Sequence, residues 1–502
     1  MRYKCRGMTA LLIVNGSTSE PGATAVAVAD GRIRAVGTDN EIREGASSEV
    51  RILDAAGGSI IPAFNDAHVH FLMASRSLGE LDLFGAGTQA EVELRVAAYA
   101  GRHAGPWVTG RGWFYSAFEG GMPPVELLDR LVPDRPAYLE SYDAHTGWAN
   151  SRALSMAGAS PGGVLKEADM LRVSRLVPAR TREQDLDALR AGMRLAASRG
   201  VVSVQEAGEG LDQLPLWQSL MDRGELTLRV RLAFDMIPGL AMADWASRLD
   251  LYEEARRDRG PWLSTGILKA FADGVVESRT ASMLEPYPGT SELGEPLWGR
   301  DELREAVRVA DARGWQVQVH AIGDAAIRQA LDAFEDATPG RRHRIEHIEA
   351  PATADLGRFA ALGVIASMQP QHAEPDLIEV WRRNLGTDRA ADAWPWRTLL
   401  ESGAHLAFGT DWPVVPLDPF ASLAVATERH ERQRIGLAQA VGAWTSGGAY
   451  AEHAEGQKGR LRPGLLADIA VLDRDLRAVS PSDLAAIQIK ATVAGGRIVH
   501  ER

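Results

Sequence analysis

Residues 59–70, with the sequence SIIPAFNDAHVH, decide how the rest of the chain is interpreted. A short apolar run leads into two histidines, His68 and His70, that are separated by one residue. Side chains of a β-strand alternate between its two faces, so both imidazoles are expected on one face and Val69 on the other. Two neutral imidazoles at the end of a buried strand are typical of a metal site. Because such a pair is also common by chance, the prediction depends on further ligands elsewhere in the chain.

The composition indicates a globular protein and argues against several kinds of partner. The chain has 502 residues, of which 45% are hydrophobic and 24% charged, enough for several domains or one large barrel with additions. A net charge of -12 argues against nucleic acid or an anionic membrane as a partner. Cys5 is the one cysteine, which excludes a disulfide within the chain and a cysteine-based zinc site. The first residues lack the apolar core of a signal peptide, and no stretch approaches a membrane span, so we expect a cytoplasmic location.

The two ends of the chain share a β-hairpin pattern. Near the N-terminus, β-rich runs at residues 24–28 and 32–36 flank Ala29-Asp30-Gly31, and near the C-terminus runs at 492–494 and 497–499 flank Gly495-Gly496. Each terminal segment is too small to fold alone. We therefore predict that residues 1–60 and 456–502 form one small β-sandwich together.

The remaining residues, 61–455, show alternating strand and helix patterns after residue 200. Strand candidates lie at residues 201–204, 228–234, 267–271, 316–320, 343–347, 364–368 and 405–409. Repeated βα units imply a parallel sheet with helices outside it, and so many in succession favour a (β/α)8 TIM barrel.

An irregular stretch at roughly residues 76–195 interrupts this pattern. It is rich in aromatic residues, namely Trp107, Trp113, Phe114, Tyr115, Tyr138, Tyr142 and Trp148. One interpretation is an insertion that carries a lid or a substrate wall, with Trp113 as a candidate substrate contact. The alternative is a satellite core beneath long loops.

Polar residues fall where the predicted barrel strands end. His320 and His347 end two of the strands, and Asp411 follows the last one in GTDWP, residues 409–413. Reactive groups of such barrels lie at the C-terminal ends of the strands. Together with His68 and His70, these residues predict a metal site.

Lys269 lies within ILKAF, residues 267–271, an otherwise apolar strand. An unpaired lysine is costly there, so it needs a partner or a changed chemical form. A carbamate formed with carbon dioxide is an anion that can bridge two metal ions, and a structural lysine is the alternative.

Taken together and in order, these motifs resemble the amidohydrolase superfamily, and within it the branch of YtcJ-like metal-dependent hydrolases that includes N-substituted formamide deformylases. The resemblance covers essentially the whole chain and implies a distorted (β/α)8 barrel with a β-sandwich made of both termini. The motifs that carry it are FNDAHVH (64–70), KAFADG (269–274), VHAIGD (319–324), RIEH (344–347), SMQP (367–370), GTDWP (409–413) and KGRLRPG (458–464).

The resemblance also implies a site for one or two Zn²⁺ ions, with another divalent metal as the alternative. The implied roles are first-metal binding for His68 and His70, second-metal binding for His320 and His347, bridging by an N6-carboxylated Lys269, and metal binding with proton transfer for Asp411.

Two further substrate-pocket candidates come from the same resemblance. His145 belongs to a family-like DAH motif at residues 143–145. Arg279 follows Asp273-Gly274 in an acidic loop, and the alternative for it is an ion pair within that loop.

The predicted site implies hydrolysis of a C–N bond other than a peptide bond, of the amide or N-formyl type. A metal lowers the pKa of a bound water from about 15.7 toward roughly 7, and the resulting hydroxide attacks the carbonyl carbon. Asp411 then acts as general base and acid. We expect a small-molecule substrate with an apolar or aromatic group. The alternatives are a deaminase, a cyclic amidase or esterase, and a non-catalytic ligand-binding homologue; a homodimer is compatible with this size.

Overall fold

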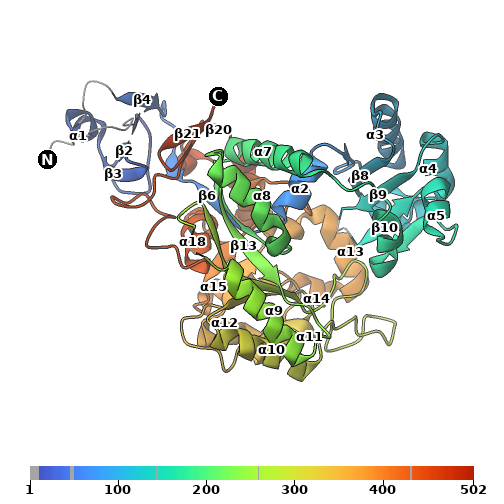
Figure 1. The fold of residues 1–502 in the computed structure, drawn as a ribbon. Coiled ribbons are helices and arrows are strands. Elements are labelled where there is room, and N and C mark those ends of the chain that lie inside the picture. The colour runs from blue at the N-terminus through green and yellow to red at the C-terminus, as the bar shows by residue number, and fades with distance from the viewer. Residues whose placement is uncertain (1–10, 46–49, 143–144, 258, 430–431) are drawn as a thin grey trace. The chain divides into compact units, whose positions relative to one another are not determined.

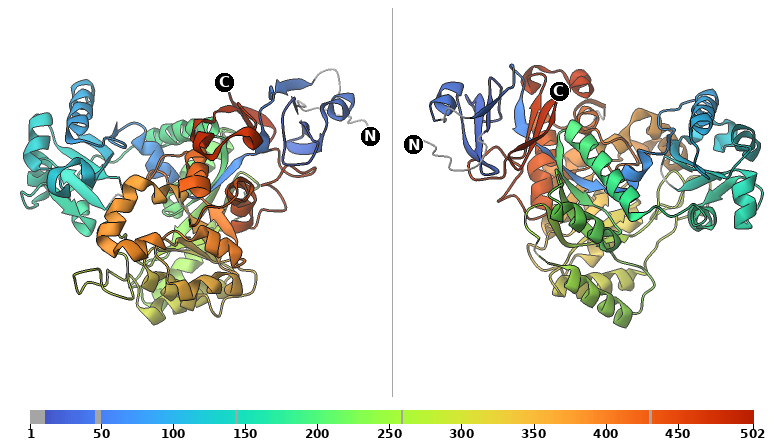
Figure 2. Two further views of the ribbon diagram at one scale, coloured as in Figure 1. Left: turned by 180° about the vertical axis from the view of Figure 1, so that it is seen from behind. Right: turned by 45° about the horizontal axis from the view of Figure 1, so that its top comes forward.

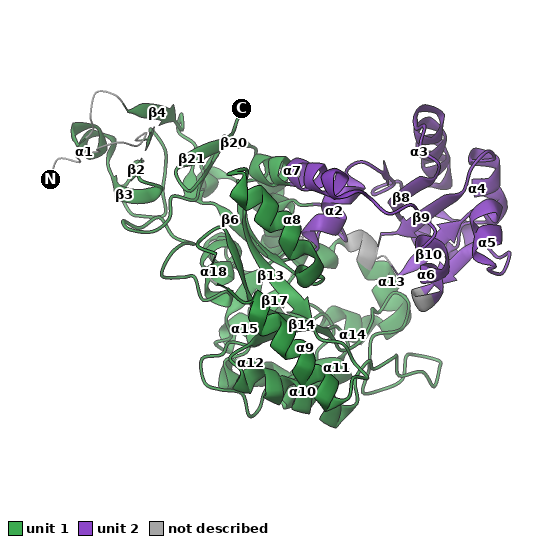
Figure 3. Cartoon of the chain, viewed as in Figure 1, with its two compact units in different colours: residues 1–69, 193–411, 417–502 green, residues 70–192, 412–416 purple. Residues whose placement is uncertain are grey.

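The computed structural model describes the chain except for residues 1–10, 46–49, 143–144, 258 and 430–431. Cys5 and the first two residues of the DAH motif therefore lie outside the described residues. The chain forms two compact units, shown in Figure 3: unit 1 comprises Met1–Val69, Met193–Asp411 and Leu417–Arg502, and unit 2 comprises His70–Gly192 and Trp412–Pro416. Among the described residues, no helix combines the length and apolar character that crossing a membrane requires.

Unit 1 contains an eight-stranded parallel sheet with the strand order β18-β17-β16-β15-β14-β13-β12-β6. The backbone N–H of Asp411, which follows β18, donates to the carbonyl of His68 in β6 at 2.7 Å, so the first and last strands also meet. This nearly closed sheet confirms the predicted distorted (β/α)8 barrel (Figure 1). The strands are β6 (Phe64–Val69), β12 (Val201–Glu206), β13 (Arg229–Asp235), β14 (Leu263–Phe271), β15 (Gln316–Ala321), β16 (Arg344–His347), β17 (Ile365–Met368) and β18 (Leu406–Phe408).

Helices follow these strands along the chain. In α10 the buried residues Leu303, Ala306, Val307 and Ala310 recur at helical spacing, as the pattern at residues 301–313 predicts. The helices are α8 (Gly210–Asp222), α9 (Met242–Ala255), α10 (Arg300–Ala312), α11 (Asp324–Ala333), α12 (Leu356–Leu362), α13 (Pro375–Leu385), α14 (Thr387–Ala391) and α15 (Trp396–Glu401).

The two faces of the barrel strands differ in polarity. On β13 the ring of Phe234 lies 4.9 Å from that of Tyr252 in α9, so this face packs against a helix. The opposite face carries Arg231, which donates to Gln316 of β15 at 3.1 Å. On β16 the fully buried Arg344 donates to the carbonyl of Ala67 in β6 at 2.6 Å. The inside of the barrel is therefore a hydrogen-bonded polar network rather than a second apolar layer.

Two four-stranded sheets of unit 1 form the β-sandwich. One contains N-terminal strands only, in the order β3-β2-β1-β4, and the other has the order β21-β20-β19-β5. Their shared core includes Leu11 and Val26 from one end of the chain and Ile469 and Val493 from the other, and both views of Figure 2 show these ends side by side. The predicted sandwich of both termini is confirmed. The strands are β1 (Leu11–Val14), β2 (Ala25–Ala29), β3 (Arg32–Gly37), β4 (Arg51–Asp54), β5 (Ile60–Pro62), β19 (Ile469–Leu472), β20 (Ile489–Ala494) and β21 (Arg497–Glu501).

The hairpin turns have the expected backbone geometry. Asp30 and Gly31 both have positive φ, at 53° and 71°, and Gly495 and Gly496 have φ of 54° and 78°. Two central residues with positive φ match the twist of the flanking strands. Between β5 of the sandwich and β6 of the barrel lies Ala63 alone, so the opening stretch joins the two parts directly.

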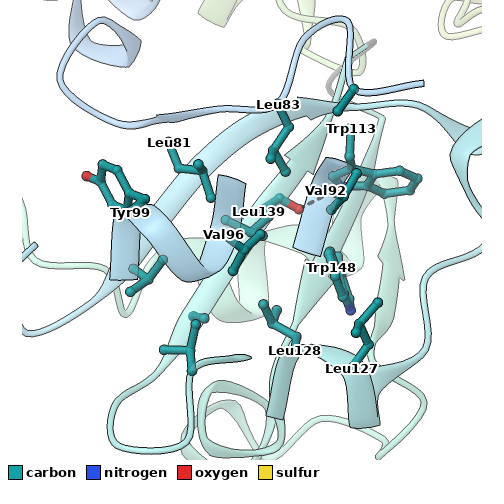
Figure 4. Packing of buried hydrophobic residues seen from close by; sticks show 14 of the residues in the cluster. Leu81, Leu83, Val92, Val96, Tyr99, Trp113, Leu127, Leu128, Leu139 and Trp148 are labelled. Atoms are coloured by element: carbon teal, nitrogen blue, oxygen red, sulfur yellow. Dashed lines mark hydrogen bonds between the residues drawn. The ribbon is translucent and has the colours of Figure 1, made fainter. Parts of the chain in front are cut away.

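Unit 2 is built on a five-stranded sheet with the order β11-β10-β9-β8-β7. Trp113 and Trp148 are fully buried in its core, and the Trp113 indole N–H donates to the carbonyl of Leu139 at 3.1 Å (Figure 4). This packing leaves Trp113 no exposed face for a substrate, so the structure supports the satellite-core alternative for this residue and not the predicted contact. The main elements are β7 (Leu81–Asp82), α3 (Gln89–Arg102), β8 (Val108–Trp113), α4 (Val125–Leu131), β9 (Ala137–Ser141), β10 (Thr146–Ala149), α5 (Ser151–Ala157) and β11 (Val164–Lys166).

Candidate metal centre

The C-terminal ends of the barrel strands bring most of the predicted ligands together. His68 lies near the end of β6, His320 near the end of β15, and His347 is the last residue of β16. The His347 ring centroid lies 4.9 Å from that of His68 and 4.5 Å from that of His320. Asp411 Oδ1 lies 3.4 Å from Nε2 of His68. All four side chains are buried.

His70 is the first residue of unit 2 and is joined to β6 through Val69. It is half-buried. Its position two residues after His68 is the reason why it remains a proposed ligand.

A buried carboxylate decides which nitrogen of His68 can bind a metal. Nδ1 of His68 lies 2.6 Å from Oε2 of Glu346, and both side chains are fully buried. Burial alone would raise the pKa of Glu346, but the neighbouring charge of Arg344, followed by His68, lowers it to about 2. Since Glu346 is then a carboxylate that only accepts, His68 donates through Nδ1–H, and its lone pair is on Nε2, toward Asp411.

Hydrogen bonds also orient the other two histidines, but through different ring nitrogens. His347 donates through Nδ1 to Oε1 of Gln369 at 2.8 Å, which leaves the lone pair on Nε2. His320 donates through Nε2 to the carbonyl of Gly274 at 3.2 Å, which leaves the lone pair on Nδ1. Burial, followed by the charge of His320, lowers the pKa of His347 well below its usual value. Neutral rings of this kind are the form that coordinates metal ions.

Lys269 lies inside the barrel with its Nζ 3.5 Å from Nε2 of His68 and 4.4 Å from the ring centroid of Phe271. Burial lowers the pKa of Lys269 to about 8, although Glu346 and Asp411 act in the opposite direction. A substantial neutral fraction near pH 8 makes this amine more nucleophilic than an ordinary lysine.

Two other buried carboxyl groups hold the loops of the site. Asp66 accepts hydrogen bonds from the backbone N–H and the hydroxyl of Thr410, at 3.0 and 2.6 Å. Asp273 accepts from the backbone N–H groups of Ser282, Ile322 and Gly323, at 2.8, 3.1 and 2.9 Å. Burial raises the pKa of each carboxyl to about 7.

The backbone is strained at two of the predicted ligands. His347 has φ of 74° and Asp411 has φ of 60°, in the left-handed region that residues other than glycine rarely adopt. Such strain costs of order 1–3 kcal/mol and persists where the surroundings impose it, often at functional sites.

His372 and Glu349 also lie at this end of the barrel, and the sequence analysis assigned them no role. Nδ1 of His372 lies 2.7 Å from Oε1 of Glu349, and Nε2 lies 3.8 Å from Oδ2 of Asp411. Burial lowers the pKa of His372, but the hydrogen bond and charge of Glu349 outweigh it, so the net pKa is raised. Both follow predicted strands, at residues 343–347 and 364–368, and that position is the signal that could have found them.

Arg279 and His145, the remaining predicted pocket residues, belong to different units. Arg279 belongs to unit 1, where its Nε donates to Oδ1 of Asn384 at 3.4 Å. His145 is half-buried in unit 2. A cavity of about 740 Å³ lies beside Leu406, the first residue of β18, and thus at the opposite end of the barrel from the candidate ligands.

The donor set fits a divalent metal. Hydrogen bonds direct the lone pairs of His68, His320 and His347, and Asp411 supplies a carboxylate beside them. Imidazole and carboxylate together are the usual ligands of such ions in hydrolytic sites.

The fold and this donor set define the class of protein. The chain belongs to the Amidohydrolase family, whose sequence pattern matches residues 51–500. It is 29% identical to the putative amidohydrolase YtcJ of Bacillus subtilis, over 95% of this chain and 96% of that protein. It is 24% identical to the N-substituted formamide deformylase of Arthrobacter pascens, over 99% of both chains.

A solved structure agrees with this family. The crystal structure of an uncharacterized metal-dependent hydrolase from Pyrococcus horikoshii matches with a TM-score of 0.77 and 26% identity, over 94% of this chain and 99% of that one. Family, relatives and candidate ligands together identify a hydrolase that uses a divalent metal.

Proposed function

We propose that this hydrolase cleaves a C–N bond other than a peptide bond, in a linear amide or N-formyl group of a small molecule. The observation that carries the proposal is the position of Asp411: its Oδ1 lies 3.4 Å from Nε2 of His68, close to the buried ring of His347, whose pKa is lowered by burial. The name of the deformylase from Arthrobacter pascens supports the choice of an N-formyl substrate.

Zn²⁺ is the metal we propose, in one or two positions. His68 and His70 would hold the first ion and His320 and His347 the second, with Asp411 beside them and Lys269 as a bridging carbamate. A bound ion supplies Lewis acidity, which lowers the pKa of water from 15.7 to about 7 and polarises a carbonyl oxygen.

The residues of this site would transfer the proton and limit the access of water. Asp411 takes the proton of the attacking water on its carboxylate and returns it to the leaving nitrogen. Its backbone, held at φ of 60° with its N–H bonded to the carbonyl of His68, keeps that carboxylate in place. Burial of the site limits access of bulk water, which strengthens each electrostatic interaction within it.

Phe271 supports a substrate with an apolar or aromatic group. It ends β14, its side chain is 40% exposed, and its ring centroid lies 5.2 Å from that of His320. An exposed aromatic ring beside the candidate ligands offers an apolar wall to the substituent of the substrate. His145 and Arg279 remain proposed pocket residues on the strength of the family resemblance.

The test combines elemental analysis with the substitution Asp411→Asn. Asparagine tolerates a positive φ almost as well as aspartate, so the backbone at this position can be retained. With zinc in excess, we expect turnover of N-benzylformamide to fall by about 10²–10⁴-fold. A wild-type chain that binds no metal, or an Asp411→Asn variant with normal turnover, would refute the proposal. If the wild type binds N-benzylformamide without hydrolysing it, the result would favour a ligand-binding protein instead.

A further inference from the structure

The cavity of about 740 Å³ beside the start of β18 has no part in the proposed hydrolysis. Three segments of unit 1 line it: residues 400–406, the helical stretch 439–450, and residues 455–465, which lead into the β-sandwich. The helical stretch contains a π-helical turn, η7 (Ala443–Gly447), and such turns are frequent at functional sites. The volume lies within the range of about 300–1,000 Å³ that small-molecule sites occupy.

Two arginines of the KGRLRPG motif line this cavity without a carboxylate partner. Arg460 and Arg462 are exposed, and no carboxylate of the described residues forms an ion pair with either. The backbone around them is nevertheless anchored. Leu461 is buried in the core of the β-sandwich, and Nζ of Lys458 lies 2.6 Å from Oε1 of Glu452. Packing and an ion pair thus fix this segment, while both guanidinium groups remain available to a ligand.

The charge of these two arginines differs from that of their surroundings. The chain has 67 acidic and 55 basic residues, and exposed arginines elsewhere pair with acids, as Arg304 of α10 does with Glu335 at 3.1 Å. Among the described residues that line the cavity, Glu455 is the one acid, and Arg342 pairs with it at 2.7 Å. The cavity therefore keeps a net positive charge. Guanidinium groups bind carboxylates and phosphates through paired hydrogen bonds.

An aromatic stack and apolar side chains form other parts of the wall. The ring of His405 stacks on that of Tyr450, at a centroid distance of 4.0 Å and an interplanar angle of 25°. His405 is itself exposed, so its ring can contact a ligand. Leu400, Leu406 and Leu465 add apolar surface. The wall therefore offers cationic and apolar contacts to the same ligand.

We propose that this cavity binds a small organic anion, with its carboxylate or phosphate held by Arg460 and Arg462 and its flat ring against His405. Because the cavity and the candidate ligands lie at opposite ends of the barrel, this is a second site, and the inference does not depend on the proposed function. A carboxylate and a phosphate share the oxyanion chemistry that two guanidinium groups recognise, and separate probes distinguish them.

Isothermal titration calorimetry of the zinc-loaded full chain tests the proposal with three probes: benzoate, phenyl phosphate and benzyl alcohol. All three carry the same ring, and only benzyl alcohol lacks an oxyanion. We expect at least one of the anions to bind about tenfold more tightly than the alcohol, and the tighter anion identifies the group that the site prefers. If neither anion binds more tightly than benzyl alcohol, the proposal is overturned.

The double substitution Arg460→Gln/Arg462→Gln locates the binding. We expect it to weaken anion binding about tenfold or more, while the affinity for benzyl alcohol stays within about twofold and zinc content and turnover are unchanged. Arg300→Gln/Arg304→Gln is the control, because it removes the same charge from α10, where these side chains are 78% and 44% exposed. An equal loss of affinity in both double variants, or no loss in either, would refute the proposal.

Hydrogen–deuterium exchange of the wild type gives an answer that does not require the variants to fold. On adding the tighter anion to the zinc-loaded chain, we expect slower amide exchange at residues 439–447 and 455–465. If exchange in both segments stays unchanged at a saturating concentration, or slows only at residues 409–413 beside the candidate ligands, the cavity is not the binding site.

Discussion

Replacing Glu346 by glutamine should weaken metal binding without touching a proposed ligand. The carboxylate of Glu346 accepts from Nδ1 of His68 at 2.6 Å and from Nε of Arg344 at 2.9 Å. The glutamine oxygen can still accept from one of these donors, but its NH₂ group then faces the other. Glu346→Gln therefore removes both the charge that pairs with Arg344 and the fixed proton position on His68.

Two losses of different size follow. Removing the carboxylate behind a metal-binding histidine typically costs 10–100-fold in metal affinity, or about 1.4–2.8 kcal/mol. Leaving Arg344 buried without its counter-charge costs about 3–5 kcal/mol of folding stability, because the guanidinium and Glu346 are both fully buried. At a zinc concentration of about 100 times the wild-type Kd, the ion stabilises the wild type by about 2.7 kcal/mol, and a 100-fold weaker site retains only about 0.4 kcal/mol of this.

The assay separates these losses. Competition with a chromogenic chelator gives the zinc affinity of the folded variant, and urea unfolding with and without zinc gives the stability of each form. The control is Glu305→Gln: Glu305 pairs with Arg308 on the exposed face of α10, at 2.7 Å and with a 41% exposed side chain. An exposed pair of this kind contributes about 0–1 kcal/mol, so the control should keep both properties.

A folded Glu346→Gln protein with wild-type zinc affinity would contradict the reasoning. It would mean that Nε2 of His68 is not a ligand atom, or that another group orients the ring equally well. A loss of stability alone, with zinc affinity unchanged, would confirm only the ion pair with Arg344.

Three further predictions concern the metal, Lys269 and Asp311. Chelation should abolish hydrolysis and lower the urea midpoint, and added zinc should restore both. With ¹³C-bicarbonate, a carbamate signal on Lys269 should grow as the pH rises through about 8, because carbon dioxide reacts with the neutral amine. Burial would raise the pKa of Asp311, but hydrogen bonds from His343, Thr338 and Arg341 lower it below 3.8, so this carboxylate stabilises the fold above pH 3.8. Asp311→Asn should therefore lower the urea midpoint at neutral pH, and the difference from the wild type should shrink as the pH falls below 3.8.

Each of these predictions has a contradicting outcome. Hydrolysis by the metal-free chain would exclude a metal role in turnover. Lys269→Gln is the control for the carbamate signal, and a wild-type spectrum identical to that of the variant would assign Lys269 a structural role. A destabilisation by Asp311→Asn that is independent of pH would show that lost packing, and not the lost charge, is responsible.

Local pattern explains why so much of the fold could be predicted. Strand periodicity, the hairpin turns at Asp30-Gly31 and Gly495-Gly496, and the helix at residues 301–313 depend on residues close in sequence. A parallel barrel then places all C-terminal strand ends at one edge, so His68, His320, His347 and Asp411 could be grouped without coordinates.

The sequence by itself therefore determined the class of fold and which residue types face the candidate site. Only the tertiary structure decided the ligand nitrogen of each histidine, because a partner as distant as 278 residues, Glu346 for His68, sets the position of the proton. It also decided that Trp113 is a core residue, since alternation places a side chain on a face of a strand but does not say what covers that face. The pair of Glu349 and His372 was missed for the same reason: their two loops meet only once the barrel has closed.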